Sequence, residues 1–257
     1  MIMPFTFSHP SITIPIKKKL GKYADFTALI IGSMAPDFEY FLRFKPVGFI
    51  GHTVLGFLYF NLPLCFIIAY IYHYIVKDLF ILCLPKPLDS WYEYLMQSRS
   101  KWELKDIKRI IIFIYSAFIG MFSHVFWDAF THKSGYFVNG LSLLTDNFVI
   151  RNYKVPIYKL MQHGSTMIGF IIILFYLYLI RDKKALRKNR FSYKLKFIYY
   201  ICFLSSGIIM LFYRFHNIEI LKYNYLGIYL VTFINGCAIG MVIVSIILKY
   251  IMKIEYH

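Results

Sequence analysis

The sequence predicts an all-α fold, a polytopic membrane helix bundle of about five spanning helices plus one N-terminal re-entrant or interfacial half-helix. Of the 257 residues, 59% are hydrophobic and only 16% are charged, whereas a soluble domain contains about 25% charged residues. Five apolar stretches approach the length of a bilayer, and the basic residues concentrate between them. We expect one integral-membrane domain that covers residues 1–257.

The spans follow from the need for about 20 mainly apolar residues to cross the hydrocarbon core. The third stretch is short, so Arg181 is expected to extend its side chain to the interface. An apolar piece at 26–35 is too short to cross and is predicted to be the half-helix, covered by protein because lipid cannot satisfy free backbone groups. Gly236 and Gly240 are expected to pack against another helix of the chain. The five predicted spans are 53–76, 110–130, 166–180, 195–213 and 226–250.

The distribution of Lys and Arg predicts the orientation, because basic loops stay on the cytoplasmic side. Loops 77–109 and 181–196, with the tail after the last span, hold 17 basic residues against 12 on the other side. We therefore expect a multi-pass protein of the inner membrane with a cytoplasmic C-terminus. If 26–44 crossed the membrane, the N-terminus would also lie inside. The net charge of +16 is thus a topology signal, and no nucleic-acid partner is expected.

The histidines and aspartates carry the most specific signal for a site. The first and third predicted spans begin on the side where the second ends, so polar residues at these three places gather at one, non-cytoplasmic, face. Asp37 immediately precedes the first span and belongs to the same face, and His9 is expected to join it. The other residues of this group are His52, His124, Asp128, His132 and His163.

Helix geometry sharpens this group. His124, Asp128 and His132 are spaced i, i+4 and i+8, so they are predicted to share one helix face over roughly 12 Å. Asp37 and Glu39 are two residues apart, so on a helix their side chains point in different directions. We expect Asp37 to be the ligand or base, and Glu39 to lie outside the set of ligands. His73, His216 and His257 are expected to have no catalytic role.

Two imidazoles with a carboxylate between them are able to chelate one divalent ion, or the carboxylate orients a histidine ligand. The ordinary alternative is that a single interfacial histidine bonds a backbone carbonyl or water. An aspartate inside a span, such as Asp128, costs a few kcal/mol and needs a partner. The expected metal ligands are Asp37, His52, His124, Asp128, His132 and His163, with Asp37 and Asp128 as catalytic residues; this ligand set suits zinc, manganese or iron.

Five segments carry a resemblance to a known family: MPFTFSHP (3–10), GSMAPDFEYFLR (32–43), GHTVLGFLYFNLP (51–63), SHVFWDAFTHKSG (123–135) and VPIYKLMQHGSTMIG (155–169). They resemble an uncharacterised bacterial integral-membrane family named only as domain of unknown function family 4184, which implies architecture without activity. The chain is more distantly similar to the membrane-bound metal-dependent hydrolases, through Pro36-Asp37, His52 and Ser123-His124 to Asp128. It carries Gly51-His52-Thr53 where that group has a double His-Ser motif, so a complete two-metal site is not implied.

The leading hypothesis is a metal-dependent hydrolase whose substrate is presented at the membrane, such as a lipid phosphoester. One alternative is a non-catalytic metal-binding or transport protein; another is an assembly protein in which polar residues lock helices together. Transport predicts a second polar cluster near the midplane or the inner face, where the sequence offers only His73 and scattered hydroxyls.

Overall fold

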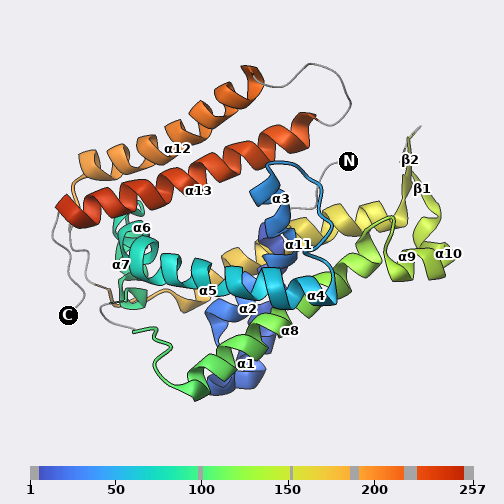
Figure 1. The fold of residues 1–257 in the computed structure, drawn as a ribbon, viewed down its shortest axis with the longest axis horizontal. Coiled ribbons are helices and arrows are strands. Elements are labelled where there is room, and N and C mark those ends of the chain that lie inside the picture. The colour runs from blue at the N-terminus through green and yellow to red at the C-terminus, as the bar shows by residue number, and fades with distance from the viewer. Residues whose placement is uncertain (1–5, 98–100, 151–152, 186–190, 217–224, 252–257) are drawn as a thin grey trace.

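The computed structural model describes residues 6–97, 101–150, 153–185, 191–216 and 225–251, and most of them are helical (Figure 1). Among these residues, five helices are long and apolar enough to cross a membrane: Val54–Cys83, Ile107–Gly140, Ile157–Ile180, Tyr193–His216 and Leu226–Ile251. They correspond to the five predicted spans and confirm the membrane helix bundle. The third, α11 (Ile157–Ile180), begins well before residue 166, so its 24 residues reach about 36 Å without help from Arg181.

The first span consists of α4 (Val54–Gly56), α5 (Leu62–Ile71) and α6 (Lys77–Cys83), joined by the π-helical turns η4 (Phe57–Asn61) and η5 (Tyr72–Val76). Thr53 caps its start by accepting a hydrogen bond from the Gly56 N–H. Asn61, in the first π-turn, donates from Nδ2 to the Gly51 carbonyl at 2.7 Å. This bond fixes the turn that presents His52.

The N-terminal segment is a helical hairpin whose two ends lie together. It runs through η1 (Thr6–Ile12), α1 (Thr13–Leu20), η2 (Gly21–Tyr23) and α2 (Phe26–Gly32), and continues into η3 (Ala35–Asp37) and α3 (Phe38–Arg43). α2 is the predicted half-helix. It lies directly against α8 (Ile107–Thr131): a Cβ added to Gly32 would stand 2.3 Å from the Ala117 carbonyl oxygen. Asp25 caps its start through the Ala28 N–H, and protein covers it as its depth requires.

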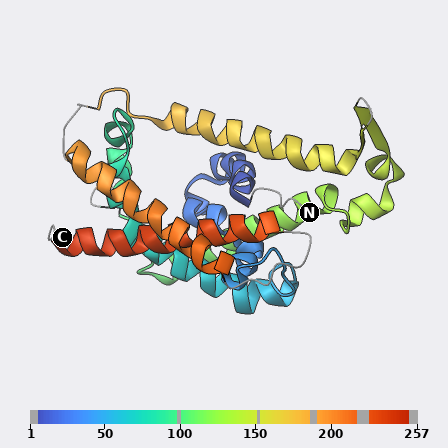
Figure 2. The ribbon, with the colours of Figure 1, turned by 90° about the horizontal axis from the view of Figure 1, so that it is seen from above.

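α12 (Tyr193–His216) and α13 (Tyr225–Ile251) pair on the side opposite α11, with the N-terminal helices between them (Figure 2). Gly236 and Gly240 pack against α12, as predicted; a Cβ on Gly236 would lie 2.7 Å from the Gly207 Cα. A buried ion pair ties α12 to α7 (Leu88–Trp91), with Lys196 Nζ 2.5 Å from Asp89 Oδ2.

The spans connect differently at the two ends of the bundle. After α8 come α9 (Tyr136–Gly140), α10 (Ser142–Thr145) and an antiparallel hairpin of β1 (Asn147–Ile150) and β2 (Tyr153–Pro156), which leads into α11. At the other end, α6 leads into α7 and η6 (Glu93–Leu95). We call these the hairpin end and the α7 end.

Candidate metal centre

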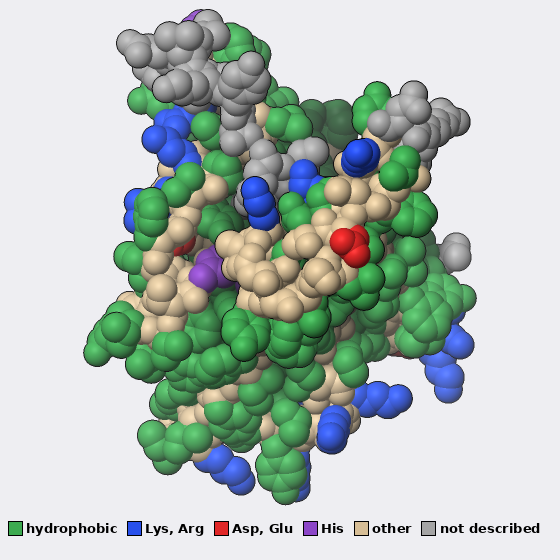
Figure 3. Space-filling view, turned by 90° about the vertical axis from the view of Figure 1, so that its right-hand side faces the viewer, with side chains coloured by type: hydrophobic (Ala, Val, Ile, Leu, Met, Phe, Trp, Pro, Cys, Tyr) green, Lys and Arg blue, Asp and Glu red, His purple; other side chains and the backbone are tan. Residues whose placement is uncertain are grey.

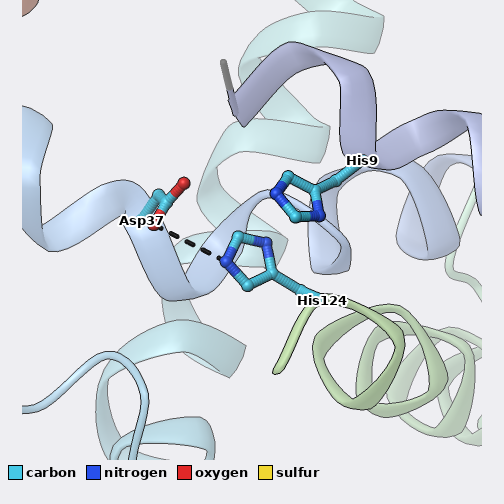
Figure 4. Close-up of side chains that lie close together, drawn as sticks. All are labelled: His9, Asp37 and His124. Atoms are coloured by element: carbon cyan, nitrogen blue, oxygen red, sulfur yellow. Dashed lines mark ion pairs between the residues drawn. The ribbon is translucent and has the colours of Figure 1, made fainter. Parts of the chain in front are cut away.

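Five predicted residues from four parts of the chain converge near the hairpin end, and Figure 4 shows three of them, His9, Asp37 and His124. η1 and η3 supply one residue each, the turn before α4 supplies one, and α8 supplies two. This convergence confirms that the polar residues beside the first two spans, and the segment before them, meet at one end. The His/Asp cluster, as we call it, consists of His9, Asp37, His52, His124 and Asp128.

Four atoms form the centre of the His/Asp cluster. His124 Nε2 lies 3.2 Å from Asp128 Oδ2 and 3.6 Å from Asp37 Oδ1. His52 Nε2 lies 3.7 Å and 3.6 Å from the same two oxygens. Two ligands bound at about 2.1 Å to one tetrahedral ion stand about 3.4 Å apart. The four distances are close to that value, and the possible ligands form two overlapping groups, His9–Asp37–His124 and His52–His124–Asp128, within which all ligand atoms lie within 4.8 Å of one another.

Hydrogen bonding prepares His124 to act as a ligand. Its Nδ1 lies 2.7 Å from the Ser33 carbonyl oxygen, to which it donates, so Nε2 is the nitrogen that a cation would bind after displacing any proton from it. That Nε2 is fully buried and has no hydrogen-bond partner among the described residues; the same holds for Asp128 Oδ1. Buried polar atoms without partners are costly. A cation between them would satisfy both.

His9 lies against the other side of His124. The two rings stack with centroids 3.9 Å apart and planes inclined by 22° (Figure 4), and His9 Nε2 stands 3.8 Å from Asp128 Oδ1. Burial, followed by the neighbouring His124, lowers the pKa of His9 to about 4. His9 is therefore neutral at pH 7, as a metal ligand must be.

Gly169 of α11 allows His9 to reach this position. A Cβ at Gly169 would meet the Ser8 carbonyl oxygen at 3.0 Å and the Ser8 Cβ at 3.1 Å. η1 therefore rests directly on the surface of α11. The position of His9 depends on a glycine that is 160 residues away in the sequence.

Asp37 is buried and ionised. Its Oδ2 accepts a hydrogen bond of 2.6 Å from the Thr6 hydroxyl. Burial alone raises the pKa of Asp37, but the electrostatic effect of the nearby His124 side chain outweighs it, and the pKa is lowered overall. With Asp128, it gives the cluster two carboxylates beside imidazoles, a combination that suits a divalent cation.

Glu39 lies outside the cluster, as the sequence predicts, and holds the loop that carries His52. Its Oε2 accepts the N–H groups of Phe49, Ile50 and Gly51 at 2.7–2.9 Å, and Arg43 donates to Oε1 at 2.7 Å. Burial acts to raise the pKa of Glu39, but these bonds lower it to about 2. Glu39 is thus an anion with a structural role.

His132 differs from its predicted position. α8 ends at Thr131, and His132 caps it in an extended conformation, so the three-residue helix face is wrong at its last member. The ring nevertheless turns back, with Nδ1 3.3 Å from Asp128 Oδ1 and Nε2 3.4 Å from Gln162 Nε2. His132 therefore contacts a carboxylate of the cluster and is not one of the five converging residues.

His163 is not brought to the cluster. Its side chain is exposed on α11, whereas the neighbouring Gln162 is buried and contacts His132. A pattern in the sequence predicts that Gln162, and not His163, faces inward, because the polar or small residues Gln162, Thr166 and Gly169 repeat at i, i+4 and i+7 along one helix face. Ser33 acts through its backbone carbonyl, for which the sequence gives no signal.

A second buried polar cluster lies towards the α7 end, where the sequence suggested little beyond His73. Thr27 Oγ1 lies 2.9 Å from His73 Nε2, and Lys77 Nζ lies 3.1 Å from His73 Nδ1. Lys77 also donates to Gln97 Oε1 at 3.1 Å. The Trp102 ring stacks on His73 with centroids 4.4 Å apart. We call His73, Lys77, Gln97 and Trp102 the Lys77 cluster.

The fold and the cluster define a class: a polytopic membrane protein with a buried His/Asp cluster near the hairpin end of its helices. The chain belongs to the family described as Domain of unknown function (DUF4184), whose model matches residues 3–246. Neither the curated proteins nor the solved structures contain a match. Function must therefore be argued from the site.

Proposed function

We propose that the protein is a metal-dependent hydrolase whose His/Asp cluster holds one divalent ion. The observation that carries the proposal is the pair of buried atoms without hydrogen-bond partners, His124 Nε2 and Asp128 Oδ1. They stand among ligand atoms spaced at 3.2–3.8 Å. Zinc, manganese and iron all suit this donor set. A bound ion would supply Lewis-acid activation of water and stabilise charge that develops on a phosphoryl or acyl oxygen.

The residues of the chain divide the work. The ion would be held by His124, His52, Asp37 and Asp128. His9, whose ring stacks on that of His124, would complete the site. Asp128 is the better proton acceptor, because its side chain is 14% exposed whereas that of Asp37 is 4% exposed. His52, with 32% of its side chain exposed, marks the opening to substrate. Figure 3 looks onto the hairpin end and shows histidine side chains at the surface.

The location of the cluster favours a substrate presented by the membrane, such as a lipid phosphoester. His52 lies just before α4, and His124 and Asp128 lie in the last two turns of α8. His52 therefore lies just outside the first candidate span, and Asp128 lies close to the end of α8. A lipid headgroup occupies this depth in a bilayer.

The N-terminal hairpin strengthens the proposed orientation in the inner membrane, with the C-terminus in the cytoplasm. The point at which the N-terminal hairpin changes direction lies towards the α7 end, because Asp25 contacts Trp102 and Thr27 contacts His73. Four lysines near this point therefore belong to the α7 end and not to the hairpin end: Lys17, Lys18, Lys19 and Lys22. The α7 end then has 21 basic residues against 8 at the hairpin end, instead of the 17 against 12 counted from the sequence. Lys253 and residues 186–190 of the basic loop lie outside the described residues. A larger bias supports a cytoplasmic α7 end.

The Lys77 cluster bears on the transport alternative, which predicts a second polar cluster near the midplane or inner face. It contains a buried lysine, and both ring nitrogens of His73 have partners. A fixed ammonium group opposes passage of a cation. The Lys77 cluster therefore supports a structural role at this end better than an ion path.

The test is metal analysis of the purified, detergent-solubilised protein, followed by hydrolysis assays on phosphoester, acyl and peptide substrates. We expect about one equivalent of zinc, manganese or iron and activity on a phosphoester. Absence of near-stoichiometric metal would overturn the proposal. Metal without hydrolysis of any of the three substrate classes would favour a metal carrier.

A further inference from the structure

A groove on α5, towards the α7 end, indicates a second ligand site. It encloses about 560 Å³ between the first span and the segment that precedes α8. One wall belongs to the candidate span Val54–Cys83, and the other consists of residues 102–105, which precede the next candidate span. Its walls include Phe66, Ile67, Tyr70, Tyr74, Trp102 and Leu104.

The groove changes from apolar to polar along its length. Phe66 and Ile67 lie about two turns deeper than Tyr74, roughly 12 Å along the helix. At the shallow end, the Tyr74 hydroxyl donates to the Trp102 carbonyl at 3.1 Å, and Lys105 pairs with Glu103 at 3.0 Å. Ile67 and Tyr70 are 54% and 59% exposed, so the deeper part opens to the hydrocarbon region.

The segment that forms the shallow end has an excess of basic residues, although Glu103 in the groove wall pairs with Lys105. Residues 101–109 include four basic and two acidic side chains. Trp102 Nε1 donates to Asp25 Oδ2 at 2.9 Å, which brings the end of the N-terminal hairpin, with exposed Lys18, Lys19 and Lys22, towards this segment. Basic side chains at a membrane surface attract anionic lipid headgroups.

We propose that this groove binds an anionic phospholipid, with an acyl chain along α5 and the phosphate beside Lys105 and Lys108. The order of groups matches a lipid in a bilayer: a charged headgroup at the boundary and an apolar chain directed towards the centre. Charge complementarity selects an anionic headgroup over a zwitterionic one. The site is separate from the His/Asp cluster and does not depend on the proposed hydrolase.

The experiment uses the full chain in lipid nanodiscs, with Trp91→Phe and Trp127→Phe so that Trp102 reports on the groove. Its fluorescence is measured with brominated phosphatidylglycerol or brominated phosphatidylcholine of the same chain length. We expect phosphatidylglycerol to quench Trp102 at lower mole fraction. The paired substitution Lys105→Ala and Lys108→Ala should reduce the preference about fivefold per lysine.

Two further variants keep the test decisive. Lys154→Ala with Lys159→Ala removes two exposed lysines at the hairpin end and should leave the preference unchanged. Ile67→Phe fills the groove and should weaken quenching by both lipids. Equal quenching by both lipids in the parent protein would overturn the proposal, as would a preference that survives loss of Lys105 and Lys108. Circular dichroism and gel filtration verify that each variant is folded.

Discussion

The His/Asp cluster and the Lys77 cluster are both buried, and both connect the N-terminal hairpin to spanning helices. In the Lys77 cluster, each ring nitrogen of His73 has a partner, and Lys77 donates to two acceptors. In the His/Asp cluster, His124 Nε2 and Asp128 Oδ1 are buried without hydrogen-bond partners among the described residues. A satisfied polar cluster locks helices together, whereas buried groups without partners are costly, and a bound cation would offset that cost in the His/Asp cluster. The difference between the two regions is therefore one of unused lone pairs, not of burial.

The largest expected effect separates the two clusters by metal content. His124→Ala removes a central ligand, so bound metal should fall from about one equivalent to nearly none. His73→Ala, also a buried histidine, should leave metal content unchanged. Elemental analysis of the purified proteins measures both. Equal loss of metal in the two variants would mean that general unfolding, not ligand removal, is responsible.

A smaller loss is expected when the contact of His132 with Asp128 is removed. His132→Ala takes away a group that orients a ligand, and such changes lower metal affinity about 10–100-fold. His163→Ala is the matched control, because its exposed side chain lies outside the cluster. Competition with a metal-binding dye measures the dissociation constants. A larger effect from His163 would contradict the site described above.

Displacing η1 tests the contribution of His9. In Gly169→Leu the new side chain meets Ser8, so His9 should move away and metal affinity should drop by about tenfold. Gly164→Leu lies on the same helix with nothing within 4 Å of its added Cβ and should have no effect. The same dye competition applies. An unchanged affinity in Gly169→Leu would show that His9 is not a ligand.

The smallest effect concerns stability alone. Lys77→Ala leaves Gln97 Oε1 and His73 Nδ1 without this donor, which should cost about 1–3 kcal/mol in the free energy of unfolding. Metal content should stay at the wild-type value. Thermal unfolding in detergent with parallel metal analysis checks both. Loss of metal here would show that the clusters are coupled through α2.

Much of the site follows from counting spans. Because the first span begins where the second ends, His52, His124 and Asp128 must lie at the same end of the bundle, whatever the packing. The spacing of Asp37 and Glu39 also predicted that only one of the two would belong to the His/Asp cluster. The positions of His132 and His163 could not be predicted from the spacing of the histidines and aspartates alone. The residue at which a helix ends and the face that it turns inward depend on tertiary packing. α8 stops at Thr131, and α11 turns Gln162 inward instead of His163.

The sequence by itself determined the membrane class, the five spans and the end at which the histidines and aspartates gather, because apolar length and chain alternation control these features. Only the tertiary structure decided which of the gathered residues touch. The N-terminal hairpin returns Asp37 to His9, Gly169 lets η1 rest on α11, and the Ser33 carbonyl fixes the ring of His124. These contacts join residues far apart in the chain through close backbone approach. No local pattern encodes such an approach, and it decides whether polar side chains form a site.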